Sequence, residues 1–235
     1  MRLGFHQPAF IPWGGFWARL AKVDQLVLLD DTLLARGFTF VNRNRIKGPE
    51  GEIWLTVPLK RKGRGRQKIR ELEIYEKSWW AKRFLATLRH FYGKSIYFEP
   101  LFSQLERIVH DQSERFLDLI EGLLLLLRDS FGFKTPFIKQ SELGISGQGT
   151  ELLVSLAEAL QTEEVLFSSF AAKHVNFSQF RQKGIKVLLL YFDLPQYPQF
   201  WGEFCPNLSA LDLYFCLGPE GRRLLERASR IEPWP

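Results

Sequence analysis

A histidine near the start of the chain and a later pair of aspartates are the side chains best suited to acid–base chemistry. His6 follows the apolar segment 2–5, and Asp30 and Asp31 follow a second apolar segment at 26–29. An imidazole titrates near neutral pH and can take a proton from a reacting group, while a nearby carboxylate can orient it. We therefore expect His6 to act as a base supported by one of the aspartates. The alternative for His6 is a histidine that only hydrogen-bonds its own turn.

The segment 40–47, Phe-Val-Asn-Arg-Asn-Arg-Ile-Lys, concentrates amide and cationic side chains. Guanidinium and ammonium groups can hold phosphate or carboxylate, and amides can stabilise an oxyanion. The alternative is a polar edge segment whose arginines bridge an insertion to the main sheet. The side chains that we expect to contact a substrate are Gln7, Trp13, Asn42, Arg43, Asn44, Arg45, Lys47, Trp54, His90, Ser209 and Asp212.

A β-α-β unit can bring the first candidates together. Residues 2–5 and 26–29 are typical of short strands, and residues 16–23 are typical of the helix that joins them. Strands joined in this way run parallel, so their carboxyl ends share one sheet edge, which is where open α/β sheets bind ligands. The C-terminal part alternates similarly, with strands expected at 137–139, 165–167 and 186–191 and helices at 150–160, 176–182 and 218–228.

Between these parts, we expect an insertion at about 50–132. Residues 52–58 and 69–75 alternate as strands do, which predicts a long hairpin with 60–70 as its loop. Apolar residues at helical spacing predict one helix at 78–93 and a longer one at 101–132. The predicted fold is thus a single α/β domain over 1–235, with a three-layer, mostly parallel Rossmann-like sheet and a β-hairpin and helical insertion.

The composition excludes a disordered or fibrous chain. The 235 residues are 46% hydrophobic and 25% charged, with a net charge of +6. Seven basic residues and no acidic one lie in 60–70, so the rest of the chain carries about −1. This segment is interpreted as a solvated loop, with a flap for an anionic substrate or a nucleic-acid contact as alternatives. A single glycine-containing loop argues against nucleic acid, which requires an extended basic face.

Several other classes of protein lack support in the sequence. No apolar run approaches the length of a membrane-spanning helix, and the N-terminus has no signal-peptide pattern, so we expect a cytoplasmic protein. Cys205 and Cys216 form no CxxC motif, which argues against zinc and leaves no metal expected. No Walker A, GxGxxG, GxSxG or HExxH motif is present, so the sequence identifies no cofactor.

Five motifs carry a resemblance to a known family. They are His-Gln-Pro-Ala-Phe-Ile-Pro-Trp-Gly-Gly-Phe at 6–16, Leu-Asp-Asp at 29–31, Asn-Arg-Asn-Arg-Ile-Lys at 42–47, Trp-Leu-Thr-Val-Pro at 54–58 and Pro-Asn-Leu-Ser-Ala-Leu-Asp at 206–212. Together they resemble the WbqC-like protein family over nearly the whole chain. The resemblance implies a place in bacterial O-antigen or other surface-polysaccharide biosynthesis, and suggests transfer of a glycyl or similar aminoacyl group to a sugar.

The leading hypothesis is therefore a transferase that joins an activated aminoacyl or acyl donor to a nucleotide- or lipid-linked amino sugar. His6 would remove the amine proton and Asp30 would orient it. Asn42 and Asn44 would stabilise the oxyanion, and Arg43, Arg45 and Lys47 would hold the diphosphate. Two alternatives are a nucleotide-dependent activating enzyme, with Gly14-Gly15 and Ser168-Ser169 around phosphates, and a nucleic-acid-binding module that uses 60–70. The sequence leaves the oligomeric state open.

Overall fold

The structure, a computed structural model, describes residues 1–35, 37 and 39–235. Within these residues, a six-stranded sheet has the order β5-β2-β1-β6-β7-β8. All neighbouring strands are parallel except β7 and β8, which are antiparallel. The strands are β1 (Arg2–His6), β2 (Gln25–Leu28), β5 (Phe137–Lys139), β6 (Glu164–Ser168), β7 (Lys186–Phe192) and β8 (Ser229–Pro233).

Helices cover both faces of this sheet because successive strand residues point to opposite sides. Leu166 and Leu188 belong to one apolar cluster, which includes side chains of α1 (Gly14–Leu20), α4 (Phe116–Ser130), α7 (Ala210–Leu217) and α8 (Gly221–Arg227). Val165 and Val187 belong to the other, with α5 (Gly149–Ala159) and α6 (Phe177–Gln182). The predicted three-layer, mostly parallel α/β fold is confirmed.

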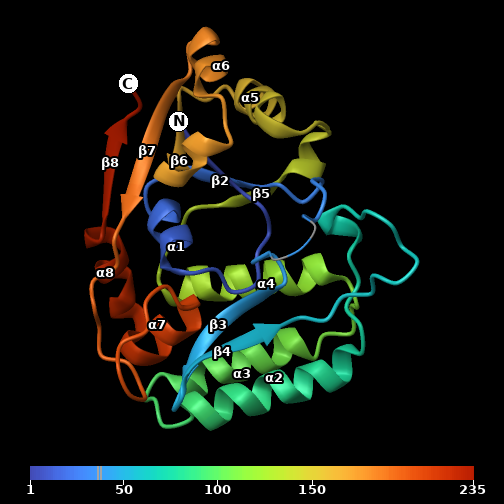
Figure 1. The fold of residues 1–235 in the computed structure, drawn as a ribbon, viewed down its shortest axis with the longest axis vertical. Coiled ribbons are helices and arrows are strands. Elements are labelled where there is room, and N and C mark those ends of the chain that lie inside the picture. The colour runs from blue at the N-terminus through green and yellow to red at the C-terminus, as the bar shows by residue number, and fades with distance from the viewer. Residues whose placement is uncertain (36, 38) are drawn as a thin grey trace.

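A hairpin and three helices lie between β2 and β5. The hairpin pairs β3 (Arg43–Gly48) with β4 (Gly51–Thr56), and α2 (Lys77–Tyr92), α3 (Phe98–Val109) and α4 follow it. Figure 1 shows the hairpin, α2 and α3 beyond the end of the sheet toward which β7 runs. The insertion therefore lies beyond the carboxyl ends of the parallel strands and faces that edge of the sheet. No helix in the described part of the chain is long and apolar enough to cross a membrane.

The predicted hairpin partners are wrong. Residues 51–56 pair with 43–48 through a short turn, at which Gly51 adopts a φ of +110°. Residues 69–71 form a short 3₁₀ helix, and only an isolated bridge from Leu59 to Ile74 joins the two ends of the basic loop. The segment 40–47 was expected to bind an anion or to form a polar edge segment that bridges the insertion to the sheet. Polar residues on both faces of β3 hide its strand periodicity.

The predicted long helix at 101–132 is also wrong, because it is divided into α3 and α4. Between them, the Ser113 amide donates to the Asp111 carboxylate at 2.8 Å, a local bond that competes with helix formation. The helix α7 and the strand β8 were not predicted. Strand β8 is half exposed at the edge of the sheet and has no apolar alternation that would reveal it.

A buried polar network joins the insertion to the rest of the fold. Asp212, on α7, accepts hydrogen bonds from the hydroxyls of Tyr92 and Tyr197, both at 2.6 Å, and from the Gln199 amide at 3.0 Å. The Lys47 backbone amide donates to the Tyr92 hydroxyl at 2.9 Å. Burial raises the pKa of the Asp212 carboxyl, while the hydrogen bonds oppose that rise. We infer that the insertion and the sheet fold as one unit.

Replacing Asp212 with alanine tests this inference. We expect a loss of about 3 kcal/mol in the free energy of unfolding in urea, because the buried tyrosine and glutamine donors lose their acceptor. Tryptophan fluorescence and far-ultraviolet circular dichroism should report one coincident transition for the unaltered chain. The exposed Asp129, which pairs only with its neighbour Arg128, supplies the control Asp129→Ala, with a change of about 0.5 kcal/mol or less. Equal effects of the two substitutions would contradict the inference.

Candidate functional site

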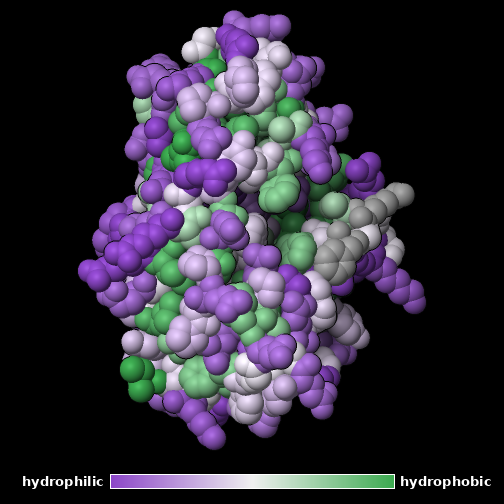
Figure 2. Space-filling view, turned by 60° about the vertical axis from the view of Figure 1, so that its left-hand side comes forward, coloured by the Kyte–Doolittle hydropathy of each residue, from purple (hydrophilic) through white to green (hydrophobic). Residues whose placement is uncertain are grey.

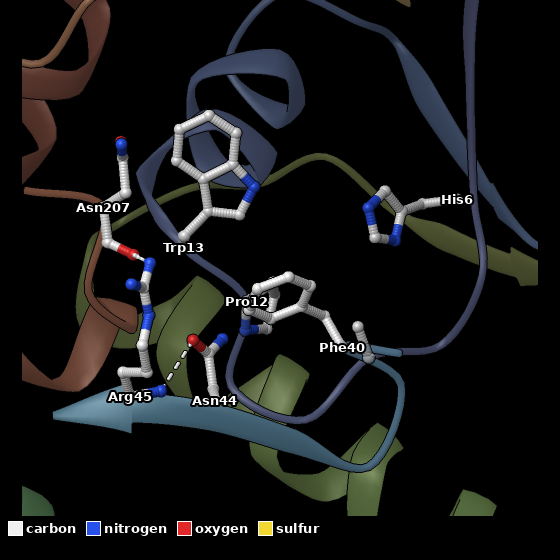
Figure 3. A pocket seen from close by; sticks show the side chains of 8 residues that line it. His6, Pro12, Trp13, Phe40, Asn44, Arg45 and Asn207 are labelled. Carbon is white, nitrogen blue, oxygen red and sulfur yellow. Dashed lines mark hydrogen bonds between the residues drawn. The ribbon is translucent and has the colours of Figure 1, made fainter. Parts of the chain in front are cut away.

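A cavity of about 380 Å³ lies between the carboxyl end of β1 and the start of the hairpin. Its described lining residues are His6, Ala9, Pro12, Trp13, Phe40, Asn44, Arg45 and Asn207. Figure 3 shows the rings of His6, Trp13 and Phe40 around this space, with Arg45 and Asn207 on one side. Figure 2 shows the surface hollowed at mid-height and bordered there by hydrophobic side chains. The site therefore has apolar walls with a few polar groups, as small-molecule sites usually do.

The floor of the cavity is a loop that the hairpin holds in place. The side-chain amide of Asn44 donates to the carbonyl of Ile11 at 2.7 Å and to that of Phe10 at 3.3 Å. Its oxygen accepts from the Arg45 backbone amide at 2.9 Å. Ile11 adopts a φ of +46°, a strained conformation for a β-branched residue. The amide of Asn44 is thus used in holding the loop rather than left for an oxyanion.

His6 ends β1 with its imidazole on the cavity wall. Its Nδ1 lies 2.6 Å from the Gln7 carbonyl oxygen, an arrangement in which Nδ1–H donates and Nε2 is left as an acceptor. Burial, and then the nearby charge of Arg19, lower its pKa to about 3, and the bond to Gln7 opposes this shift. The imidazole is therefore uncharged at neutral pH.

The other walls of the cavity consist of aromatic rings and the guanidinium of Arg45, which is bound to other residues of the protein. Trp13 packs edge-on against Phe192, with ring centroids 5.4 Å apart, and its backbone pairs with that of Ser209. The Nη1 atom of Arg45 lies 2.8 Å from both carboxylate oxygens of Glu52. The Nη2 atom of Arg45 donates to the Asn207 carbonyl at 3.1 Å. Arg45 thus joins the hairpin to the 206–212 segment, and Glu52 offsets its charge.

The two aspartates lie outside the cavity lining. Asp30 is fully buried and accepts from the Ser141 amide at 2.9 Å and from the Ser141 hydroxyl at 2.6 Å. Asp31 pairs with Lys68 at 2.8 Å and with Arg70 at 2.5 Å. Both carboxylates therefore connect the end of β2 to other segments, and the structure does not bring them to His6 within the site.

Several other expected contact residues are buried or placed elsewhere. Asn42 donates to the Val57 carbonyl, Lys47 binds Gln199 and backbone carbonyls at 202 and 203, and Gln7 donates to Thr32. Ser209 and Asp212 are buried, while His90 is exposed on α2, where its ring contacts Phe91. Trp54 is 44% exposed on β4, and Arg43 is partly buried on β3. Four expected residues therefore meet at the cavity: His6, Trp13, Asn44 and Arg45.

The remaining lining residues lie in the segments that carried the family resemblance or the polar cluster. Ala9 and Pro12 belong to 6–16, Asn207 belongs to 206–212, and Phe40 opens the segment 40–47. Their membership in these motifs was the available signal. The residue types of Ala9, Pro12 and Phe40 indicate no chemistry, so only the fold could assign these three to a site.

Most of the basic segment 60–70 is neutralised by nearby acids. Lys60 pairs with Glu73 and Glu114, and Arg64 pairs with Glu73 at 2.6 Å. Hydrogen bonds from Arg64 and then Lys60 lower the pKa of Glu73 to about 2. Since Lys68 and Arg70 pair with Asp31, four of the seven cations in this segment have acidic partners. This pairing disfavours the nucleic-acid alternative.

Sequence comparison places the chain among known proteins. The pattern of the WbqC-like protein family matches residues 7–224. The chain belongs to the WbqC-like protein family. This WbqC-like protein is 32% identical over 216 residues to the uncharacterized protein Rv1507c of Mycobacterium tuberculosis (strain ATCC 25618 / H37Rv), covering 91% of this chain and 93% of that protein. No solved structure matches the chain.

The pH dependence of stability tests the environment of His6. The folded pKa of about 3 lies below the ordinary 6.5, so the unfolded chain binds the proton more readily between these values. Stabilisation by neutral His6 is complete above about pH 6.5 and is lost as pH falls toward 3, by at most about 1.4 kcal/mol per pH unit. Replacing His6 with asparagine should flatten this part of the stability curve in urea titrations. Parallel stability curves for the unaltered and His6→Asn proteins, or equal flattening of the curve by His90→Asn, would contradict a lowered pKa for His6.

Proposed function

We propose that this protein is a cytoplasmic transferase of bacterial surface-polysaccharide (O-antigen) biosynthesis that forms an amide between an amino sugar and an activated aminoacyl or acyl donor. The observation that carries the proposal is the uncharged imidazole of His6 on the wall of an aromatic-lined cavity. Membership in the WbqC-like family supports the pathway. The cavity volume, about 380 Å³, lies within the range of small-molecule sites.

The cavity combines apolar walls with polar groups at its rim, an arrangement that suits a sugar ring. The rings of Trp13 and Phe40 offer flat apolar faces, against which the apolar face of a pyranose can pack. The Asn207 side chain has no hydrogen bond to another described residue, so its amide can bind a sugar hydroxyl. In this arrangement, the amine of the sugar lies next to His6 Nε2.

The amide bond then forms in two steps. The amine nitrogen attacks the acyl carbonyl carbon, a C–N bond forms, and the carbonyl electrons move to oxygen. The N–H proton of this tetrahedral intermediate passes to His6 Nε2. The carbonyl re-forms as the bond to the leaving group breaks, and the proton moves from His6 to that group. In this scheme the Gln7 carbonyl, rather than Asp30, orients the imidazole, because it accepts from Nδ1.

The low pKa of His6 limits the point in this reaction at which the imidazole can accept a proton. A pKa of about 3 makes His6 a poor base toward the free ammonium form of an amino sugar. The nitrogen becomes far more acidic once it is bonded to the acyl carbon, so the proton is accepted after attack. The same low pKa makes release of the proton to the leaving group favourable.

Mass spectrometry of nucleotide-linked amino sugars, incubated with the protein and activated glycyl or acyl donors, tests the proposed function. The expected product carries one added aminoacyl or acyl mass. His6→Ala should lower kcat by about 10²- to 10⁴-fold with little change in KM, since His6 acts in the proton transfer. Phe40→Ala should chiefly raise KM for the sugar.

The exposed His90 provides a matched control, because it lies outside the cavity lining. His90→Ala should retain the kcat and KM of the unaltered protein. Full turnover by the His6→Ala protein would overturn the proposed role of His6. Failure of every donor and amino sugar to react would overturn the transferase assignment.

A further inference from the structure

Arg19 is a buried guanidinium without an anionic partner. The residue is 7% exposed on α1, and its Nε atom has no hydrogen-bond partner. No carboxylate of the described residues lies within ion-pair distance of it. Burial lowers its pKa to about 10, which still leaves it charged at neutral pH. An unpaired buried charge is costly, so its presence calls for a compensating group.

The geometry of α1 directs this side chain toward the carboxyl edge of the sheet. Arg19 lies one turn after Gly15 on the same helix face, and helical side chains lean toward the N-terminus of their helix. The helix contacts β6 and β7, and the charge of Arg19 helps to lower the pKa of His6 at the end of β1.

That end of β1 lies where the strand order of the sheet reverses. Strand β1 connects to β2 on one side, while its other neighbour, β6, connects to β7 on the opposite side. Ligands bind at such a reversal of strand order. Gly4 pairs with Leu166 in the register of the two strands. Two residues further along, His6 and Ser168 therefore lie side by side at the strand ends. Because side chains two residues apart share a face, both lie on the face of the sheet that α1 covers.

We propose that Arg19 binds a phosphoryl group at the neighbouring carboxyl ends of β1 and β6, with Ser168 beside it. A guanidinium fork matches two phosphoryl oxygens, and a doubly charged anion compensates a buried cation better than a carboxylate does. The inference rests on the proposed function only in assigning the phosphate to the diphosphate of a nucleotide- or lipid-linked sugar.

Two of the cations first expected to hold the diphosphate, Arg45 and Lys47, support this choice by their engagement elsewhere. Arg45 binds Glu52, and the Lys47 ammonium binds Gln199 and backbone carbonyls. Among Arg19, Arg45 and Lys47, only Arg19 lacks a protein acceptor within the described residues.

Isothermal titration of the full chain with inorganic phosphate, pyrophosphate, uridine diphosphate and acetate tests the proposal. Arg19→Met should weaken binding of the phosphoryl ligands at least tenfold. Without ligand, the same variant should be as stable as the unaltered chain or more stable, because it removes an uncompensated buried charge. A merely structural arginine would give the opposite stability result. Arg107→Met, at an exposed arginine on α3, is the matched control and should change neither property.

Each outcome decides the proposal. Kd values above about 10 mM for all three phosphoryl ligands, or equal phosphoryl binding by the Arg19→Met protein, would overturn it. Acetate binding as tight as phosphate binding would overturn the phosphoryl assignment. Tighter binding of uridine diphosphate than of phosphate supports a nucleotide source, and equal binding supports a phosphoryl group alone. If Arg19→Met fails to fold, Arg19→Lys should retain weakened phosphoryl binding, and complete loss would count against the proposal. Phosphoryl binding without acyl transfer would overturn the proposed function alone.

Discussion

The cavity exists because one buried amide satisfies a loop that belongs to no regular element. The residues after β1 include two prolines, which cannot donate backbone hydrogen bonds, and Ile11 in a left-handed conformation. Asn44 supplies the donors that the carbonyls of Phe10 and Ile11 need. Without them, these buried carbonyls would cost free energy comparable to lost hydrogen bonds. The hairpin is therefore required for the shape of the site, although it contributes no strand to the main sheet.

The buried ionisable groups divide into satisfied and unsatisfied sets. Asp212 has three donors, and Lys47 has one amide and two carbonyl oxygens within reach. Such groups hold elements together, since every hydrogen bond that they need is supplied by the chain. Arg19 differs because its charge has no counterpart in the described residues. Since Asp212 and Lys47 have partners from the chain, the lack of an anionic partner for Arg19 within the described residues indicates that its partner is a ligand.

The sequence predicted the scaffold better than the site because apolar periodicity records burial, whereas polar residue types do not. The strands and helix that place His6 at a sheet edge follow from apolar segments near the N-terminus. Asn44 and Lys47 were expected to bind substrate because their side chains can do so. In the fold they are 2% and 1% exposed and are bound to protein groups. Arg19 was missed for the converse reason, since one arginine in an apolar helix resembles a residue at the helix surface.

The positions of these groups also constrain how one substrate could occupy both proposed sites. Arg19 is a buried residue of α1, while Trp13 and Phe40 line the cavity toward the hairpin. His6 belongs to both regions, because it ends β1 and lines the cavity. A linked sugar would therefore extend from its diphosphate at Arg19, past His6, to its ring against the aromatic walls. In that orientation the charged carrier pairs with the buried cation, and the neutral reacting amine meets an uncharged imidazole. Burial, the larger cause of the low pKa of His6, would persist when the phosphoryl group offsets the charge of Arg19, so the imidazole would stay uncharged for proton transfer.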